Sequence, residues 1–126
     1  MTQDEFSTEY YSIAERAITF SEKSRREGFL AMEEELNVEK ADNRDIFEYG
    51  IRLVVDGWDS VIIEKILSNI IQQEKDEDLR RLKAMQKEAV LLVQVGVNTR
   101  VLCLALNSYA KLTLKEDKSM KDLEYF

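Results

Sequence analysis

Cys103 has the most reactive side chain in this chain, and its surroundings argue against catalysis. It is the single cysteine among 126 residues, and the chain contains no histidine. A nucleophilic thiolate needs a neighbouring base or cation, and histidine is the usual one. Cys103 also lies within the apolar run 101–106. We therefore interpret it as a small buried hydrophobic residue of a protein from a reducing compartment.

Acidic clusters are the other groups that could do chemistry, by attracting a metal ion. They occur at residues 33–35 and 76–78. Consecutive residues of a helix point in different directions, so neither cluster would surround an ion, and a solvated helix face explains both. The chain also lacks paired cysteines and a glycine-rich phosphate loop. We expect no metal, no cofactor and no enzyme activity; a pocket with convergent polar groups would reopen the enzyme alternative.

The most distinctive feature is the charged run at residues 21–35, in which basic residues come first and acidic residues follow. On a continuous helix, Arg25 and Glu33 would lie near one face and about 12 Å apart. That separation is too long for an ion pair and suits a docking edge whose two ends have opposite charge. A partner with the complementary charge order would be favoured over one with the reverse order. The alternative is a solvated face with weak local ion pairs.

Helical periodicity runs through most of the chain, so we predict an all-α fold: a small bundle of about four helices with a long N-terminal helix. The absence of proline leaves few forced breaks. The first helix is expected over residues 7–36. A stripe of small residues, Ser21, Ser24, Gly28 and Ala31, would let another backbone approach this helix closely. Otherwise Gly28 is simply tolerated there, at a cost of about 1 kcal/mol relative to alanine.

Turn and cap residues delimit the second helix. It is expected over residues 44–55, with Asp42 or Asn43 as its N-cap. Asp56 and Gly57 would end it, since glycine readily takes the left-handed conformation of a C-terminal cap.

The third helix is expected to begin after Asp59, which is placed to act as its N-cap. Trp58 before the cap and Ile63 after it occupy the two positions of a hydrophobic staple. We therefore place Trp58 in the core and expect Trp58→Ala to destabilise the fold by about 3 kcal/mol. The polar residues 72–81 either continue this helix or interrupt it.

Residues 90–106 allow two interpretations. Their valines and leucines would suit two short strands joined by a turn at Gly96. We favour a helix, a cap around Gly96 and a last helix over residues 99–114, because the pattern does not alternate cleanly and two isolated strands are only marginally stable. Residues 1–115 would then form one domain, and the mostly charged residues 116–126 a flexible tail.

Composition and charge disfavour several classes of protein. The formal net charge is −7, and an acidic surface repels phosphate, so we expect no binding to nucleic acid. Residues 1–9 lack the basic and apolar regions of a signal peptide. The longest apolar stretches, 89–97 and 101–106, are too short to span a bilayer. We expect a soluble, cytoplasmic protein.

Three stretches of the chain resemble the cytoplasmic part of flagellar motor stator A subunits, the MotA type of the MotA/TolQ/ExbB proton channel family. The charged run at residues 21–35 is similar to the first cytoplasmic helix of these subunits. Residues 50–59, GIRLVVDGWD, resemble the family pattern LRLVVDG-D, and residues 88–102, EAVLLVQVGVNTRVL, resemble EG-L-IQ-G-NPRVL. Thr99 stands where the last pattern usually has proline. The three stretches occur in the order found in the family.

The resemblance implies a function in binding. Arg25 and Glu33 align with the stator charges that contact the rotor switch protein (FliG type), and the neighbouring Arg26 and Glu34 would share that role. The membrane-spanning helix pairs of the family have no counterpart in these stretches, so the chain would not conduct ions by itself. The expected partner is the rotor switch protein or a stator component, and the expected place is near the cytoplasmic face of the inner membrane at the flagellar motor.

Two alternatives stay open at this stage. The chain is either a natural soluble paralogue or an engineered derivative without membrane helices; residues 72–87 contain no glycine or serine, which favours the natural form. The function could instead be self-association, as a homo-oligomeric structural or assembly adaptor that uses the small-residue stripe and the isoleucines of the third helix.

Overall fold

The computed structural model describes residues 1–36 and 45–110, and every regular element in these two ranges is a helix. The elements are α1 (Gln3–Glu27), the 3-10 helix η1 (Phe29–Glu35), α2 (Ile46–Val55), α3 (Ser60–Ile71), α4 (Glu77–Val95) and α5 (Thr99–Asn107). The all-α expectation and the long N-terminal helix are confirmed. About four helices was too few, because η1 is a separate element and a break separates α4 from α3.

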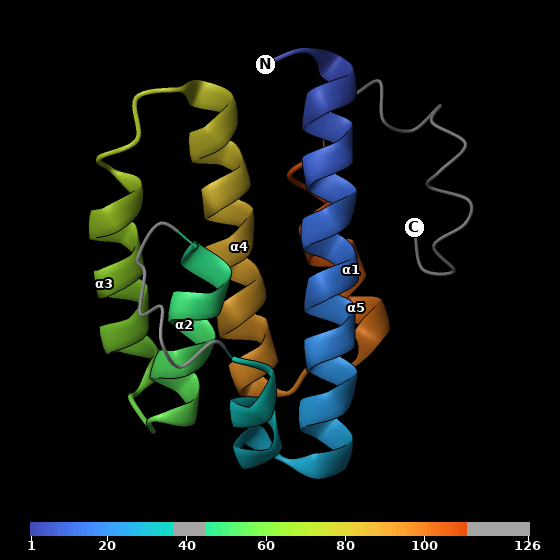
Figure 1. The fold of residues 1–126 in the computed structure, drawn as a ribbon, viewed down its shortest axis with the longest axis vertical. Coiled ribbons are helices and arrows are strands. Elements are labelled where there is room, and N and C mark those ends of the chain that lie inside the picture. Colours follow the sequence, from blue (N-terminus) through green and yellow to red (C-terminus); the bar gives the residue numbers. More distant parts are fainter. Residues whose placement is uncertain (37–44, 111–126) are drawn as a thin grey trace.

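Helix α4 forms the centre of the bundle. It packs against α1, α2, α3 and α5, and Figure 1 shows it between α3 and α1. Its inward side chains recur at helical spacing and are buried: Leu82, Met85, Ala89, Val90 and Val93. Helix α1 contributes a matching face without exposed surface: Phe6, Tyr10, Ala14 and Ala17. Burial of these faces, worth about 25 cal/mol per Å² of apolar surface, is the main term that stabilises the bundle.

Helix α1 ends at Glu27, so the expected continuous helix over residues 7–36 is wrong. Gly28 has φ +86° and ψ 168°, a backbone conformation that is essentially confined to glycine. Its N–H donates a hydrogen bond to the Ser24 carbonyl at 2.9 Å, and the chain then folds as η1 beside the end of α1 (Figure 1). The periodicity continued past Gly28 because Met32 of η1 is also buried, although it belongs to a different element.

The small-residue stripe of α1 is interrupted for the same reason. Ser21 and Ser24 are buried within α1, but Gly28 ends this helix and Ala31 lies on η1. Gly28 is therefore a turn residue rather than a tolerated helix glycine. The helix also begins earlier than expected, because the Thr2 hydroxyl accepts a hydrogen bond from the Glu5 N–H at 3.1 Å as its N-cap.

The N-cap of α2 differs from the expected one, whereas its C-terminal end is the expected one. Asp45 is its N-cap and accepts a hydrogen bond from the Glu48 N–H at 3.1 Å. The proposed caps at residues 42 and 43 are therefore wrong as caps of α2, and both positions lie outside the described residues. The expected end at Asp56 and Gly57 is confirmed, with Gly57 at φ +88°.

The loop between α2 and α3 confirms one prediction and overturns another. Asp59 accepts a hydrogen bond from the Ile62 N–H at 2.9 Å and caps α3 as expected. Trp58, in contrast, is 52% exposed, so its placement in the core is wrong. The buried face of α3 begins at Ile63 and repeats every four residues along the helix, whereas Trp58 precedes the cap and lies outside this face. Its carbonyl oxygen accepts a hydrogen bond from the Gln94 side chain at 2.8 Å, which ties its backbone to α4.

The second half of the chain follows the helical interpretation. The polar residues 72–81 contain a break: α3 ends at Ile71, and Asp76 caps α4 by accepting from the Leu79 N–H at 3.0 Å. Gly96 ends α4 at φ +82°, as expected. Helix α5 follows and ends at Asn107, earlier than the expected residue 114. The described ranges contain no strand, and none of their helices is long and apolar enough to cross a membrane.

The expected domain limit at residue 115 and the expected tail at 116–126 lie outside the described residues.

Candidate functional site

The four charged residues expected to bind a partner lie on two different elements around Gly28. Arg25 and Arg26 are in the last turn of α1, and Glu33 and Glu34 are on η1. All four side chains are exposed, and none forms an ion pair with the described residues. We call this set the docking corner. The 12 Å spacing of one straight helix does not apply to it, since Gly28 redirects the chain between the two pairs.

An ion pair fixes η1 against α1 beside the docking corner. The Lys23 ammonium lies 2.6 Å from Oε1 of Glu35, and the two side chains are 19% and 42% exposed. The hydrogen bond to Glu35 is the main cause of a raised pKa for Lys23. Of the three consecutive acidic residues on η1, Glu35 therefore has a structural partner, whereas Glu33 and Glu34 form no ion pair with residues 1–36 and 45–110.

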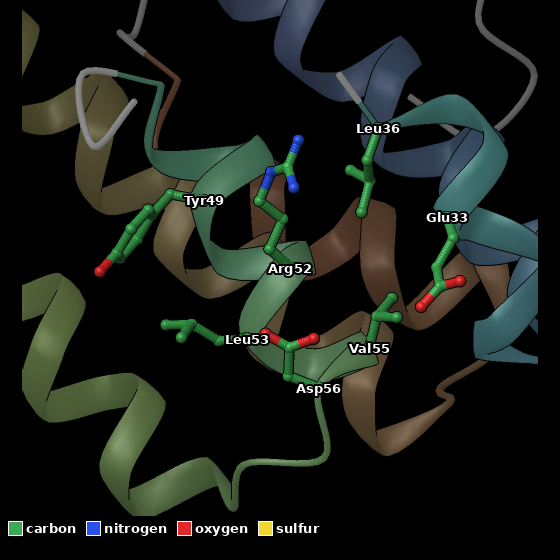
Figure 2. Close-up of a pocket in the computed structure, with 7 residues that line it drawn as sticks. All are labelled: Glu33, Leu36, Tyr49, Arg52, Leu53, Val55 and Asp56. Carbon is green, nitrogen blue, oxygen red and sulfur yellow. The ribbon is translucent and has the colours of Figure 1, made fainter. Parts of the chain in front are cut away.

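A pocket opens where η1 meets α2. Its volume is about 460 Å³, and Figure 2 shows the seven side chains that line it. The lining is Glu33, Leu36, Tyr49, Arg52, Leu53, Val55 and Asp56. We call it the η1–α2 pocket. Its size lies within the range of small-molecule and side-chain binding sites, and it adjoins the docking corner because Glu33 belongs to both.

Arg52 is a positively charged residue in the lining of the η1–α2 pocket. It forms an ion pair with a carboxylate that lies beyond hydrogen-bond distance. Its Nη2 lies 3.8 Å from Oε1 of Glu48, in the preceding turn of α2. Glu48 is shared, since its other oxygen lies 4.0 Å from Nη2 of Arg16. The Nε and Nη2 atoms of Arg52 are buried and donate no hydrogen bond within the described part of the chain. In Figure 2 the guanidinium extends away from the Asp56 carboxylate.

The other residues singled out in the sequence serve the fold. Gly28, Gly57 and Gly96 all have positive φ and end helices. Asp59 is a cap, while Asp56, expected to be structural, both ends α2 and lines the pocket. Sequence reasoning missed Leu36 and Arg52, whose roles depend on η1 folding back onto α2.

Cys103 is buried, as expected for a small hydrophobic residue. Burial, with a smaller effect from the charge of Glu22, raises the pKa of its thiol to about 11. The thiolate is therefore scarce at neutral pH, and the reactive form is disfavoured. In residues 1–36 and 45–110, no group of three or more histidine, cysteine, aspartate or glutamate side chains is arranged to hold a metal ion.

The chain matches no family model, no curated protein and no solved structure.

Proposed function

We propose that the protein is a binding module that recognises a partner protein through the docking corner, Arg25, Arg26, Glu33 and Glu34, without a catalytic step. Following the resemblance to stator A subunits, the partner is the rotor switch protein (FliG type) or a stator component of the flagellar motor, and the protein is cytoplasmic. The observation that carries the proposal is that all four charges are exposed and unpaired with respect to the described residues.

The composition of the docking corner favours recognition by charge order. The chain has a net charge of −7, so Arg25 and Arg26 form a local positive spot on a mostly acidic protein. Glu33 and Glu34 follow on η1, which the ion pair between Lys23 and Glu35 holds in place. A fixed arrangement of opposite charges speeds association with a complementary surface and penalises the reversed one.

The proposal is tested by binding of the intact chain to the C-terminal domain of the rotor switch protein. We expect Arg25→Glu and Glu33→Lys each to weaken binding by about tenfold or more, which corresponds to about 1.4 kcal/mol. Lys65→Glu on α3 and Glu15→Lys on α1 change the net charge equally at exposed positions away from the corner. If these control variants weaken binding as much as the corner variants, net charge rather than the corner is responsible.

Self-association is the second candidate function, and exposed apolar residues at the start of α3 favour it. Trp58 is 52% exposed and Val61 73% exposed, and Ile62 beside them is also exposed. Three large apolar side chains within five residues form a local patch of a kind found at protein interfaces.

Light scattering on the purified chain over a range of concentrations tests this candidate. A mass that increases with concentration, and that Val61→Lys reverts to the monomer, would support self-association through α3. A monomer at the highest concentration would remove this candidate and leave the docking corner unaffected.

A further inference from the structure

The η1–α2 pocket contains a cation, Arg52, with two hydrogen-bond donors that no described residue accepts from. Arg52 is about four-fifths buried, and its Nε and Nη2 atoms are inaccessible to bulk water and donate no hydrogen bond to the described residues. The nearest carboxylate among the described residues, on Glu48, is 3.8 Å away, compared with about 2.8 Å for a hydrogen-bonded guanidinium–carboxylate pair. Buried donors are nearly always satisfied in native proteins, so the position calls for an acceptor that the described residues do not supply.

The apolar walls of the pocket indicate which chemical group the occupant presents beside its hydrogen-bond acceptor. Leu36, Leu53 and Val55 supply apolar surface, and Figure 2 shows Leu36 and Val55 facing each other across the space from opposite sides. A small ion alone would leave this apolar surface in contact with water. An occupant that brings an apolar side chain next to its acceptor would bury the surface and satisfy the guanidinium together.

The remaining charges select among possible acceptors. Glu33 and Asp56 lie on the side of the pocket away from the Arg52 guanidinium (Figure 2), and neither forms an ion pair with the described residues. With the net charge of −7, these two carboxylates repel a phosphate group or another multiply charged anion. A single carboxylate carries the least charge that still forms a strong, two-pronged pair with arginine.

We propose that the η1–α2 pocket binds a segment of a partner protein that presents a carboxylate next to an apolar side chain, with the Arg52 guanidinium turning towards the pocket to receive the carboxylate. The site extends the binding surface beyond the docking corner. It does not require the corner, because Arg52, Leu36 and Val55 carry it, and Glu33 only borders it.

The test uses a matched pair of probes that differ in one charge. The intact 15N-labelled chain is titrated with N-acetyl-L-leucine, which has a carboxylate beside an apolar side chain, and with neutral N-acetyl-L-leucinamide at the same ionic strength. We expect the Nε–H resonance of Arg52 to shift and saturate with the acid at millimolar concentration and to stay unshifted with the amide. The resonance is assigned by its loss in Arg52→Lys.

Two variants separate the guanidinium from general effects. Arg52→Lys keeps the charge but loses the planar pair of donors, so the acid should bind roughly tenfold more weakly, as judged from backbone amide shifts around the pocket. Arg100→Gln removes an exposed arginine on α5 and should leave binding unchanged. Thermal unfolding of each variant confirms that it is folded.

Three results would overturn the proposal: no saturable shift with the acid, equal shifts with acid and amide, or equal binding by Arg52→Lys. None of them bears on the docking corner, which is tested by Arg25→Glu and Glu33→Lys in binding to the rotor switch domain.

Discussion

A Cβ atom added to Gly50 of α2 would lie 2.6 Å from Cγ2 and 2.9 Å from Cγ1 of Val90 in α4. Gly50 thus allows the backbone of α2 to approach the central helix of the bundle. Both residues are buried, and Leu67 of α3 would lie 3.1 Å from the same Cβ. Three helices meet at this position, which lies between Tyr49 and Arg52 of α2, two of the residues that line the η1–α2 pocket.

We expect Gly50→Ala to destabilise the protein by about 1–3 kcal/mol, because forced overpacking outweighs the gain of up to about 1 kcal/mol in helix propensity. Urea unfolding followed by circular dichroism measures the change. The matched test is the same substitution in a Val90→Ala background, where the room is restored and the two effects should be strongly non-additive. Additive effects would show that α2 and α4 are not in this contact.

Gly28 allows a test of the corner between α1 and η1. A Cβ at Gly28 meets no atom within 4 Å, so any cost of Gly28→Ala must come from the backbone, at φ +86° and ψ 168°. We expect a loss of about 1–3 kcal/mol. Gly28→Asn should cost as much, whereas Gly96→Asn should cost less, since Gly96 is in the left-handed region that asparagine tolerates.

A stable Gly28→Ala variant would mean that α1 continues through this position. The docking corner would then revert to the straight arrangement first expected from the sequence, so the measurement checks the geometry of the proposed function as well as the fold.

Helix ends were predictable where the hydrogen bond that makes them is local. Asp59 caps α3 through an N–H three residues ahead, and Gly57 and Gly96 end α2 and α4 by adopting positive φ. Each of these features depends on the residue type and a few neighbours, which a sequence displays directly. The same local logic failed for α2, because Asp45 rather than an earlier residue makes the cap.

The features that were missed depend on contacts between distant residues. Apolar periodicity continued across Gly28 because both α1 and η1 bury a face, and periodicity does not report a change of direction. The η1–α2 pocket exists because η1 folds back so that Leu36 meets α2. Arg52 gave no signal, since an arginine on a short amphipathic helix is ordinary until the element that covers it is known.

The loop at Trp58 gives a prediction that reverses the expectation from sequence. Because Trp58 is half exposed, Trp58→Ala should change the free energy of unfolding by less than about 1 kcal/mol. Ile63→Ala, five residues later and fully buried, should cost about 2–5 kcal/mol. Thermal or urea unfolding of the two variants side by side checks the contrast. Equal losses would place the indole in the core after all.

Tyr10 gives a prediction about alkaline pH. Its side chain is fully buried on α1, and its hydroxyl donates to the Leu106 carbonyl and to Oδ1 of Asn107, each at 3.4 Å. Burial is the main cause of a raised pKa for Tyr10, above its ordinary value of 10.0. The unfolded chain therefore ionises this phenol at a lower pH than the folded chain. Its contribution to stability is fully present below pH 10 and is lost as the pH rises towards the folded pKa.

Tyr10→Phe should therefore lower the free energy of unfolding near neutral pH and raise it, relative to the wild type, at alkaline pH. Near pH 7 the variant loses the one hydroxyl proton that Tyr10 shares between two acceptors at 3.4 Å, and we expect a loss of about 1 kcal/mol. Above pH 10 the wild type loses up to about 1.4 kcal/mol per pH unit through this residue, whereas phenylalanine has no proton to lose. Urea unfolding at pH 7 and at pH 11 measures both values. If the variant is less stable by the same amount at both pH values, Tyr10 ionises as readily in the folded chain as in the unfolded one, and α1 and α5 do not bury its hydroxyl between them.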